Sequence, residues 1–121
     1  YAPGKWTVRE VVGHISDCER VFAYRALCIG RGDATPLPGF DENLYVPEGR
    51  FERRTLADIA AEFATIRAAT LTLFRSFDEI ALNRRGTASD CPVSPRAVAA
   101  IIAGHELHHV KLLRERYGLT G

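Results

Sequence analysis

Apolar residues recur at helical spacing in three segments of the chain and predict three long helices, over residues 7–29, 55–77 and 95–117. Each segment opens on a residue whose side chain can cap a helix N-terminus: Thr7, Thr55 and Ser94. Glu10 follows Thr7 at the spacing of a capping box, which strengthens the first of these starts. No segment alternates between apolar and polar residues for more than a few positions, so the pattern predicts an all-α fold.

Two connections separate the predicted helices, and the first is unusually long. Residues 30–54 are rich in Gly and Pro, and a connection of this length is typical of a functional loop or of a crossover in a helical bundle. The second connection, residues 78–94, is shorter. We expect residues 1–121 to form a single bundle domain. Because the chain opens at Tyr1 rather than Met, we also expect residues to precede it, and a fourth helix there would complete the bundle.

Charge and cysteine content narrow the possible partners and the compartment. Sixteen basic and fifteen acidic residues give a net charge of +1, so no strong field attracts nucleic acid or an anionic membrane. No apolar run is long enough to cross a bilayer. Three cysteines at irregular spacing argue against a disulfide framework. We therefore expect a cytoplasmic protein that binds neither nucleic acid nor membrane.

Histidine is rare in this chain, and its placement is the strongest chemical signal. His105 and His109 lie one turn apart in the middle of the apolar face of the third predicted helix, whereas His108 lies nearer the margin. Burying an imidazole without a partner is unfavourable, and two at this spacing can chelate one metal ion. His14 borders the apolar face of the first helix and could supply a third ligand. The alternative is that these are core histidines hydrogen-bonded to backbone or carboxylates.

Two neighbouring residues offer competing interpretations of such a site. Cys18 lies one turn after His14 and could close the site as a fourth ligand, although a small buried core residue is the simpler interpretation. The run from His105 to His109 also matches the H-E-x-x-H pattern of zinc peptidases, in which Glu106 would be the general base. Only twelve residues follow His109 and none is His or Asp, which argues against a peptidase.

Acidic residues near the histidines are candidates for orienting the imidazoles. Glu19 falls inside the apolar face of the first helix, where a carboxylate needs a cation or several donors. It can pair with a buried arginine, or it can hold a ligand imidazole in position. The arginines we consider as its partner are Arg25, Arg67 and Arg96. Asp17, just under one turn after His14, could accept the imidazole N–H or simply be solvated.

The chain resembles a known family in three places. Residues 4–20 read G-K-W-T-V-R-E-V-V-G-H-I-S-D-C-E-R, residues 104–109 read G-H-E-L-H-H, and the long connection contains F-D-E-N-L. These motifs are similar to those of the DinB-like superfamily (DinB/YfiT type). The resemblance implies a four-helix bundle with a long crossover, whose first helix would precede the W-T motif at Trp6. It also implies one divalent metal ion held by His14, His105 and His109, and a homodimer.

Members of that superfamily have been viewed as metal-dependent hydrolases, and related proteins transfer low-molecular-weight thiols to electrophiles. We therefore expect a zinc, nickel or iron ion that acts as a Lewis acid on a small-molecule substrate or thiol. Three carboxylates are candidates for orienting its ligands: Asp17, Glu19 and Glu106. The long connection could select the substrate through Asp41, Glu42, Asn43 and Tyr45. The alternative is a catalytically silent metal-binding or dimerisation module.

Overall fold

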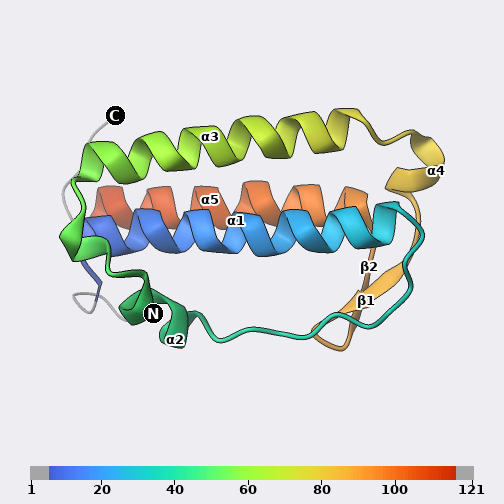
Figure 1. Cartoon of the computed structure of the whole chain (residues 1–121), viewed down its shortest axis with the longest axis horizontal. Coiled ribbons are helices and arrows are strands. Elements are labelled where there is room, and N and C mark those ends of the chain that lie inside the picture. Colours follow the sequence, from blue (N-terminus) through green and yellow to red (C-terminus); the bar gives the residue numbers. More distant parts are fainter. Residues whose placement is uncertain (1–5, 117–121) are drawn as a thin grey trace.

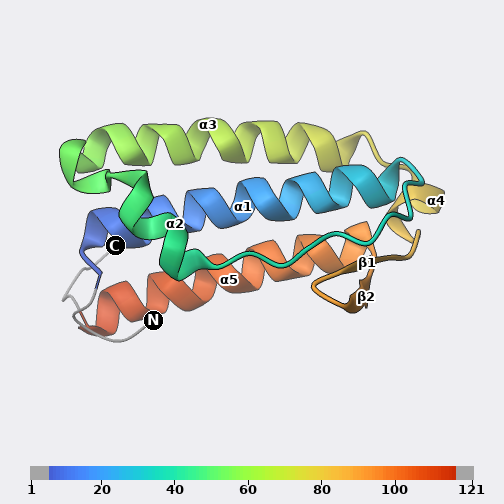
Figure 2. The same cartoon turned by 60° about the horizontal axis from the view of Figure 1, so that its bottom comes forward.

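The chain folds as a layer of three long helices, and its two connections carry the shorter elements (Figure 1). The computed structural model describes residues 6–116. In chain order the elements are α1 (Val8–Gly30), α2 (Glu42–Gly49), the 3-10 turn η1 (Phe51–Arg53), α3 (Leu56–Arg75), α4 (Glu79–Leu82), β1 (Gly86–Ala88), β2 (Cys91–Val93) and α5 (Pro95–Arg116). Helix α1 lies in the middle and packs against both α3 and α5, as Figure 2 shows. The all-α prediction is confirmed.

The three predicted helix starts are confirmed, because each capping side chain makes its expected hydrogen bond. Thr7 and Glu10 form a complete capping box at the start of α1. Thr55 accepts a hydrogen bond from the backbone N–H of Asp58 at the start of α3. Ser94 Oγ accepts one from the N–H of Ala97 at the start of α5. These bonds satisfy amide groups that the helix itself leaves without an acceptor, so the helix starts are encoded locally.

The structure corrects the sequence prediction in the two connections and at one helix end. Residues 30–54 contain α2 and η1, and residues 78–94 contain α4 and an antiparallel hairpin of β1 and β2. Helix α3 ends at Arg75 rather than at residue 77, and the predicted end of the last helix at Tyr117 falls outside the described residues. Among residues 6–116 there are three long helices, so a fourth long helix is not part of the described chain.

The apolar core is divided into two clusters with polar side chains between them. One cluster, at the start of α1, contains Val11, Ile15 and Leu113. The other contains Ala26, Phe77, Ala81, Val98 and Ile102. Between them α1 and α5 bury His14, Glu19 and His109. Within the described part of the chain, no helix is both long enough and apolar enough to cross a membrane.

The long connection is fastened to α1 at two points. The Phe51 ring of η1 packs directly over Gly13 of α1, a position where any Cβ would overlap with the ring. Further along α1, the Arg25 guanidinium donates hydrogen bonds to the Pro38 carbonyl (2.9 Å) and to Ser89 Oγ of the hairpin turn (3.3 Å). These contacts hold the connection beside α1, so that α2 lies over the same stretch of α1 that carries His14.

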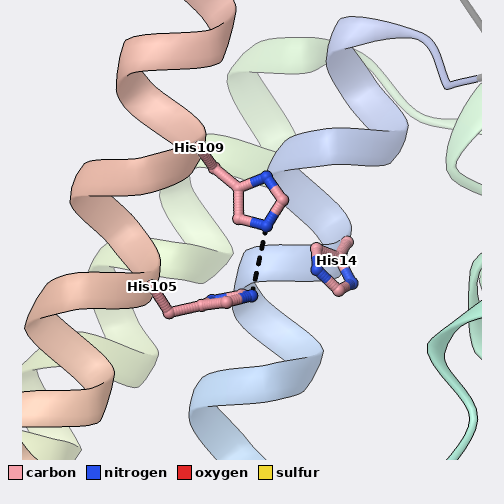
Figure 3. Close-up of side chains that lie close together, drawn as sticks. All are labelled: His14, His105 and His109. Atoms are coloured by element: carbon pink, nitrogen blue, oxygen red, sulfur yellow. Dashed lines mark hydrogen bonds between the residues drawn. The ribbon is translucent and has the colours of Figure 1, made fainter. Parts of the chain in front are cut away.

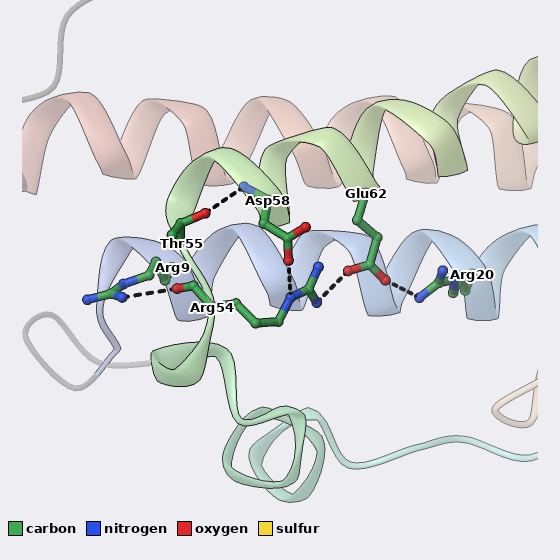
Figure 4. Close-up of polar contacts among 6 residues, drawn as sticks. All are labelled: Arg9, Arg20, Arg54, Thr55, Asp58 and Glu62. Carbon is green, nitrogen blue, oxygen red and sulfur yellow. Dashed lines mark hydrogen bonds and ion pairs between the residues drawn. The ribbon is translucent and has the colours of Figure 1, made fainter.

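A network of ion pairs joins α1 to the start of α3 on the surface of the bundle (Figure 4). Arg54 binds Asp58 (2.6 Å) and Glu62 (2.6 Å), and Glu62 also binds Arg20 of α1 (2.7 Å). Arg9 of α1 donates a hydrogen bond to the backbone carbonyl of Arg54 (3.0 Å). Because exposed ion pairs each contribute only about 0–1 kcal/mol, this network is a minor source of stability.

Candidate metal centre

Three imidazoles converge between α1 and α5. His14 extends from α1, and His105 and His109 extend from successive turns of α5, so that all three rings meet at one point (Figure 3). Their candidate ligand atoms all lie within 4.8 Å of one another. The two Nε2 atoms of His105 and His109 are 3.1 Å apart, in a hydrogen bond whose direction depends on the tautomers. The spacing of four residues on α5 produces this pair, because side chains at i and i+4 project to the same side of a helix.

Burial keeps these imidazoles neutral. His14 and His109 are about 5% and 4% exposed, and His105 is half-buried. Burial, followed by the charge of His105, lowers the pKa of His14 from its ordinary 6.5 to about 4. The same two causes lead for His109, whose pKa falls to about 3, and burial also lowers the pKa of His105. A neutral imidazole has a free lone pair, so near pH 7 the group is ready to coordinate a cation.

Aromatic rings line the centre. The Trp6 ring lies 4.8 Å from the His14 ring, and the Phe22 ring lies 5.7 Å from the His105 ring, both measured between centroids. Trp6, the tryptophan of the W-T motif, therefore contacts a candidate ligand. An apolar surround limits access of water and fixes the orientation of the imidazoles. The donor set and its surroundings fit a metal ion bound by three nitrogens.

Cys18 lies beside His14 rather than at the centre of the group. Its Sγ is 3.6 Å from His14 Nδ1, yet the cluster of mutually close ligand atoms contains only the three imidazoles. Burial, followed by the negative charge of Glu42, raises the pKa of the Cys18 thiol to about 12. Because the thiolate is the form that binds metal, this environment favours the interpretation of Cys18 as a buried core residue.

Two of the candidate carboxylates bind an arginine instead of an imidazole. Glu19 accepts hydrogen bonds from Arg67 on both of its oxygens, at 2.7–3.2 Å, and Glu106 accepts one from Arg67 Nη2 at 2.7 Å. Of the three arginines considered from the sequence, Arg67 is therefore the partner of Glu19. Among the described contacts, neither carboxylate accepts a hydrogen bond from a histidine.

The position of Glu106 also bears on the peptidase interpretation. A zinc peptidase requires the carboxylate of its H-E-x-x-H motif to act as a base at the metal, whereas Glu106 is held by Arg67 on the α3 side of α5. His108 is exposed and outside the group of three imidazoles, as expected from its place at the margin of the apolar face.

The long connection lies close to the centre, as the sequence suggested. The negative charge of Glu42, the first residue of α2, partly opposes the lowering of the pKa of His14 and of His105 by burial. Asp41 caps α2 by accepting a hydrogen bond from the backbone N–H of Asn43 (2.9 Å), so its side chain has a structural partner.

A cavity of about 470 Å³ separates α2 from α1. Asp17 lines it from α1, and burial raises the pKa of this carboxyl above its ordinary value. Tyr45 lines it from α2 together with Leu44 and Glu48. No hydrogen bond joins Asp17 to His14 within the described residues, so the carboxylate faces this cavity as a separate polar group.

Fold and centre together define a class of protein: a layer of three long helices, in which α1 and α3 run parallel and α5 runs antiparallel to both, with a cluster of three histidines that could hold one metal ion (Figure 1). A family model described as the DinB superfamily matches residues 1–113, and the chain belongs to that superfamily. This confirms the resemblance found in the sequence motifs. No curated protein and no solved structure gives a significant match to the chain.

Proposed function

We propose that the protein binds one divalent metal ion through His14, His105 and His109 and acts with it on a small-molecule substrate, as a hydrolase or as a thiol S-transferase. The observation that carries the proposal is the convergence of three imidazoles whose ligand atoms lie within 4.8 Å of one another. Their lowered pKa values support it, since no proton competes for the lone pairs near pH 7. Nitrogen donors suit zinc, nickel or iron.

Three protein ligands leave at least one coordination position for another molecule, which is typical of catalytic rather than structural sites. A divalent ion there supplies Lewis-acid chemistry, lowering the pKa of a water or thiol towards neutrality. The rings of Trp6 and Phe22 exclude bulk water from the three imidazoles, and Glu42 places a negative charge on the α2 side of them. The cavity between α1 and α2 is large enough for the body of a small substrate.

A catalytically silent metal-binding or dimerisation module is the second candidate. The observation in its favour is that Arg67 binds both Glu19 and Glu106, which removes two of the three carboxylates expected to serve the site. Asp17 then remains the candidate proton acceptor on α1, with a raised pKa. A silent module should bind metal as tightly as the enzyme but show no turnover of esters or thiol-reactive electrophiles.

Elemental analysis of protein purified without an affinity tag tests the metal directly. We expect about one divalent ion per chain, because the site offers a single point of convergence. His105→Ala should lose most of the metal, whereas His108→Ala removes an exposed imidazole outside the cluster and serves as the matched control. Equal metal content in His105→Ala and the parent protein would contradict the proposal.

Cobalt substitution distinguishes an open three-histidine site from one closed by Cys18. In the open site, the absorption bands of the cobalt protein should shift when imidazole or a small thiol is added, since a coordination position is available. Cys18→Ser should retain both the metal and these shifts. A strong thiolate-to-cobalt charge-transfer band that disappears in Cys18→Ser would show that the sulfur is a ligand and that the open-site proposal is wrong.

A further inference from the structure

Arg67 connects the two helices that carry the candidate metal ligands, although it lies on a third helix that carries none. From α3 its guanidinium binds Glu19 of α1 through Nε (3.0 Å) and Nη2 (2.7 Å), and the same Nη2 binds Glu106 of α5 (2.7 Å). Glu19 is one residue beyond Cys18 and Glu106 directly follows His105. The arginine therefore joins α1 to α5 at the level of the imidazole cluster.

Backbone packing does not join α3 to α5. Helix α1 packs closely against both α3 and α5, whereas the backbones of α3 and α5 stay apart within the described chain. A cavity of about 220 Å³ lies between α3 and α5, lined by Arg67, Glu106 and apolar side chains that include Leu71 and Phe74. The polar contact across this space depends on the length of the Arg67 side chain, so shortening it would break the link to Glu106.

The chemistry of the pair favours a role in positioning. Glu19 is about 2% exposed, and burying a carboxylate is costly enough that its ion pair adds little net stability over an apolar core. Such a pair fixes the orientation of the carboxylate, because a planar guanidinium holds it through two parallel hydrogen bonds. Side chains that bind a metal must be held within about 0.5 Å of the productive geometry.

We propose that Arg67 is a positioning residue of the metal centre, fixing the rotation and spacing of α1 and α5 so that His14 meets His105 and His109. This inference rests on the proposed function, since it concerns the same centre. The hydrogen bonds described for Arg67 go to Glu19 and Glu106 and not to an imidazole, so on this proposal it acts through these two carboxylates. Its role is to set the geometry of the ligands before the ion arrives, and its loss should weaken metal binding more than folding.

The test compares zinc affinity with stability. Metal-free protein is titrated with Zn²⁺ in competition with a chelating dye, and unfolding is followed separately in urea. Arg67→Met should weaken zinc binding about 10- to 100-fold, the range found when residues that orient metal ligands are replaced. Arg54→Met is the matched control, because Arg54 also pairs with two carboxylates, Asp58 and Glu62, but both lie on α3 and neither is on α1 or α5. Its zinc affinity should stay within about twofold of the parent.

Arg67→Met could unfold the protein because it leaves the Glu19 carboxylate unpaired. In that case a second variant separates the positioning role from an effect on folding. Replacing the triad by apolar residues (Glu19→Leu, Arg67→Met, Glu106→Leu) should preserve stability, as such replacements of buried ion pairs often do. We expect this variant to fold and to bind zinc about tenfold or more weakly. A folded variant with parental zinc affinity would overturn the positioning role alone. A parent protein that binds no zinc would overturn both this inference and the proposed function.

Discussion

Gly13 and Gly104 provide a test of how tightly the long connection is fixed against the site. Both glycines lie inside long helices, where alanine is intrinsically favoured by about 1 kcal/mol. They differ only in their surroundings. A Cβ on Gly104 would meet nothing within 4 Å, whereas a Cβ on Gly13 would stand 2.5 Å from Phe51 Cδ1 and closer still to Cε1 and Cζ. The same substitution should therefore have opposite effects at the two positions.

The magnitude follows from how far the Phe51 ring would have to move. Ordinary contact begins at 3.4 Å, so the ring would need to retreat by at least about 0.9 Å. Its opposite edge is packed against Gly49, where a Cβ would likewise overlap with the ring, which leaves little room to retreat. Overpacking of this kind costs about 1–3 kcal/mol. After the gain in helix propensity, Gly13→Ala should lower the free energy of unfolding by up to about 2 kcal/mol, and Gly104→Ala should raise it by up to about 1 kcal/mol.

Urea unfolding of the metal-free variants, followed by circular dichroism at 222 nm, measures both changes. A second measurement tests the cause: in a Phe51→Leu background the side chain at residue 51 is smaller, so Gly13→Ala should cost less than in the parent. Equal shifts of the same sign for Gly13→Ala and Gly104→Ala would refute the reasoning. So would an unchanged cost of Gly13→Ala in the Phe51→Leu background, since the two residues would then not interact.

Two further predictions concern protons and metal. Folding lowers the pKa of His14 from 6.5 to about 4, so below pH 6.5 the unfolded chain takes up a proton at this residue that the folded chain does not. The free energy of unfolding of the metal-free protein should fall between pH 6.5 and 4, with about 3 kcal/mol of the fall due to His14, and His14→Phe should reduce the fall by that amount in urea titrations. Zinc at about 100 times its dissociation constant should raise the free energy of unfolding by about 2.7 kcal/mol, and a chelator should reverse this; an unchanged unfolding midpoint with and without zinc would exclude binding to the folded state.

The elements predicted well from sequence are those whose signals are local. Helix starts at Thr7, Thr55 and Ser94 depend on a side chain and an amide three residues away, and all three are confirmed. Helix α2 was not predicted because eight residues form too short a stripe to stand out, and Pro47 lies within it. The β1–β2 hairpin was missed for the same reason, since three residues per strand cannot establish an alternation.

In the candidate site, too, the features with a local sequence signal were predicted and those that depend on helix packing were not. The pairing of His105 with His109 follows from their spacing on one helix, and the structure places His14, expected from the sequence as a third ligand, in the same cluster. The partners of the carboxylates depend on how three helices are rotated against one another, and the sequence does not specify this. It narrowed the partner of Glu19 to three arginines, and only the packing of α3 against α1 selects Arg67.

The polar layer between the two apolar clusters has two different kinds of electrostatic balance. Around Arg67 the opposite charges are paired within the chain and leave one net negative charge, because a buried carboxylate and a half-buried one share a guanidinium. Around His14 there is no charge to pair, because burial lowers the pKa values of His14 and His109 and keeps these imidazoles neutral. A divalent ion would place positive charge among neutral donors, with the net negative charge of the Glu19–Arg67–Glu106 triad and of Glu42 nearby to compensate it. On this argument, acid should weaken the metal-free fold, because protons bind the imidazoles of the unfolded chain first, and zinc should protect the fold most strongly between pH 6 and 8, where the imidazoles are neutral.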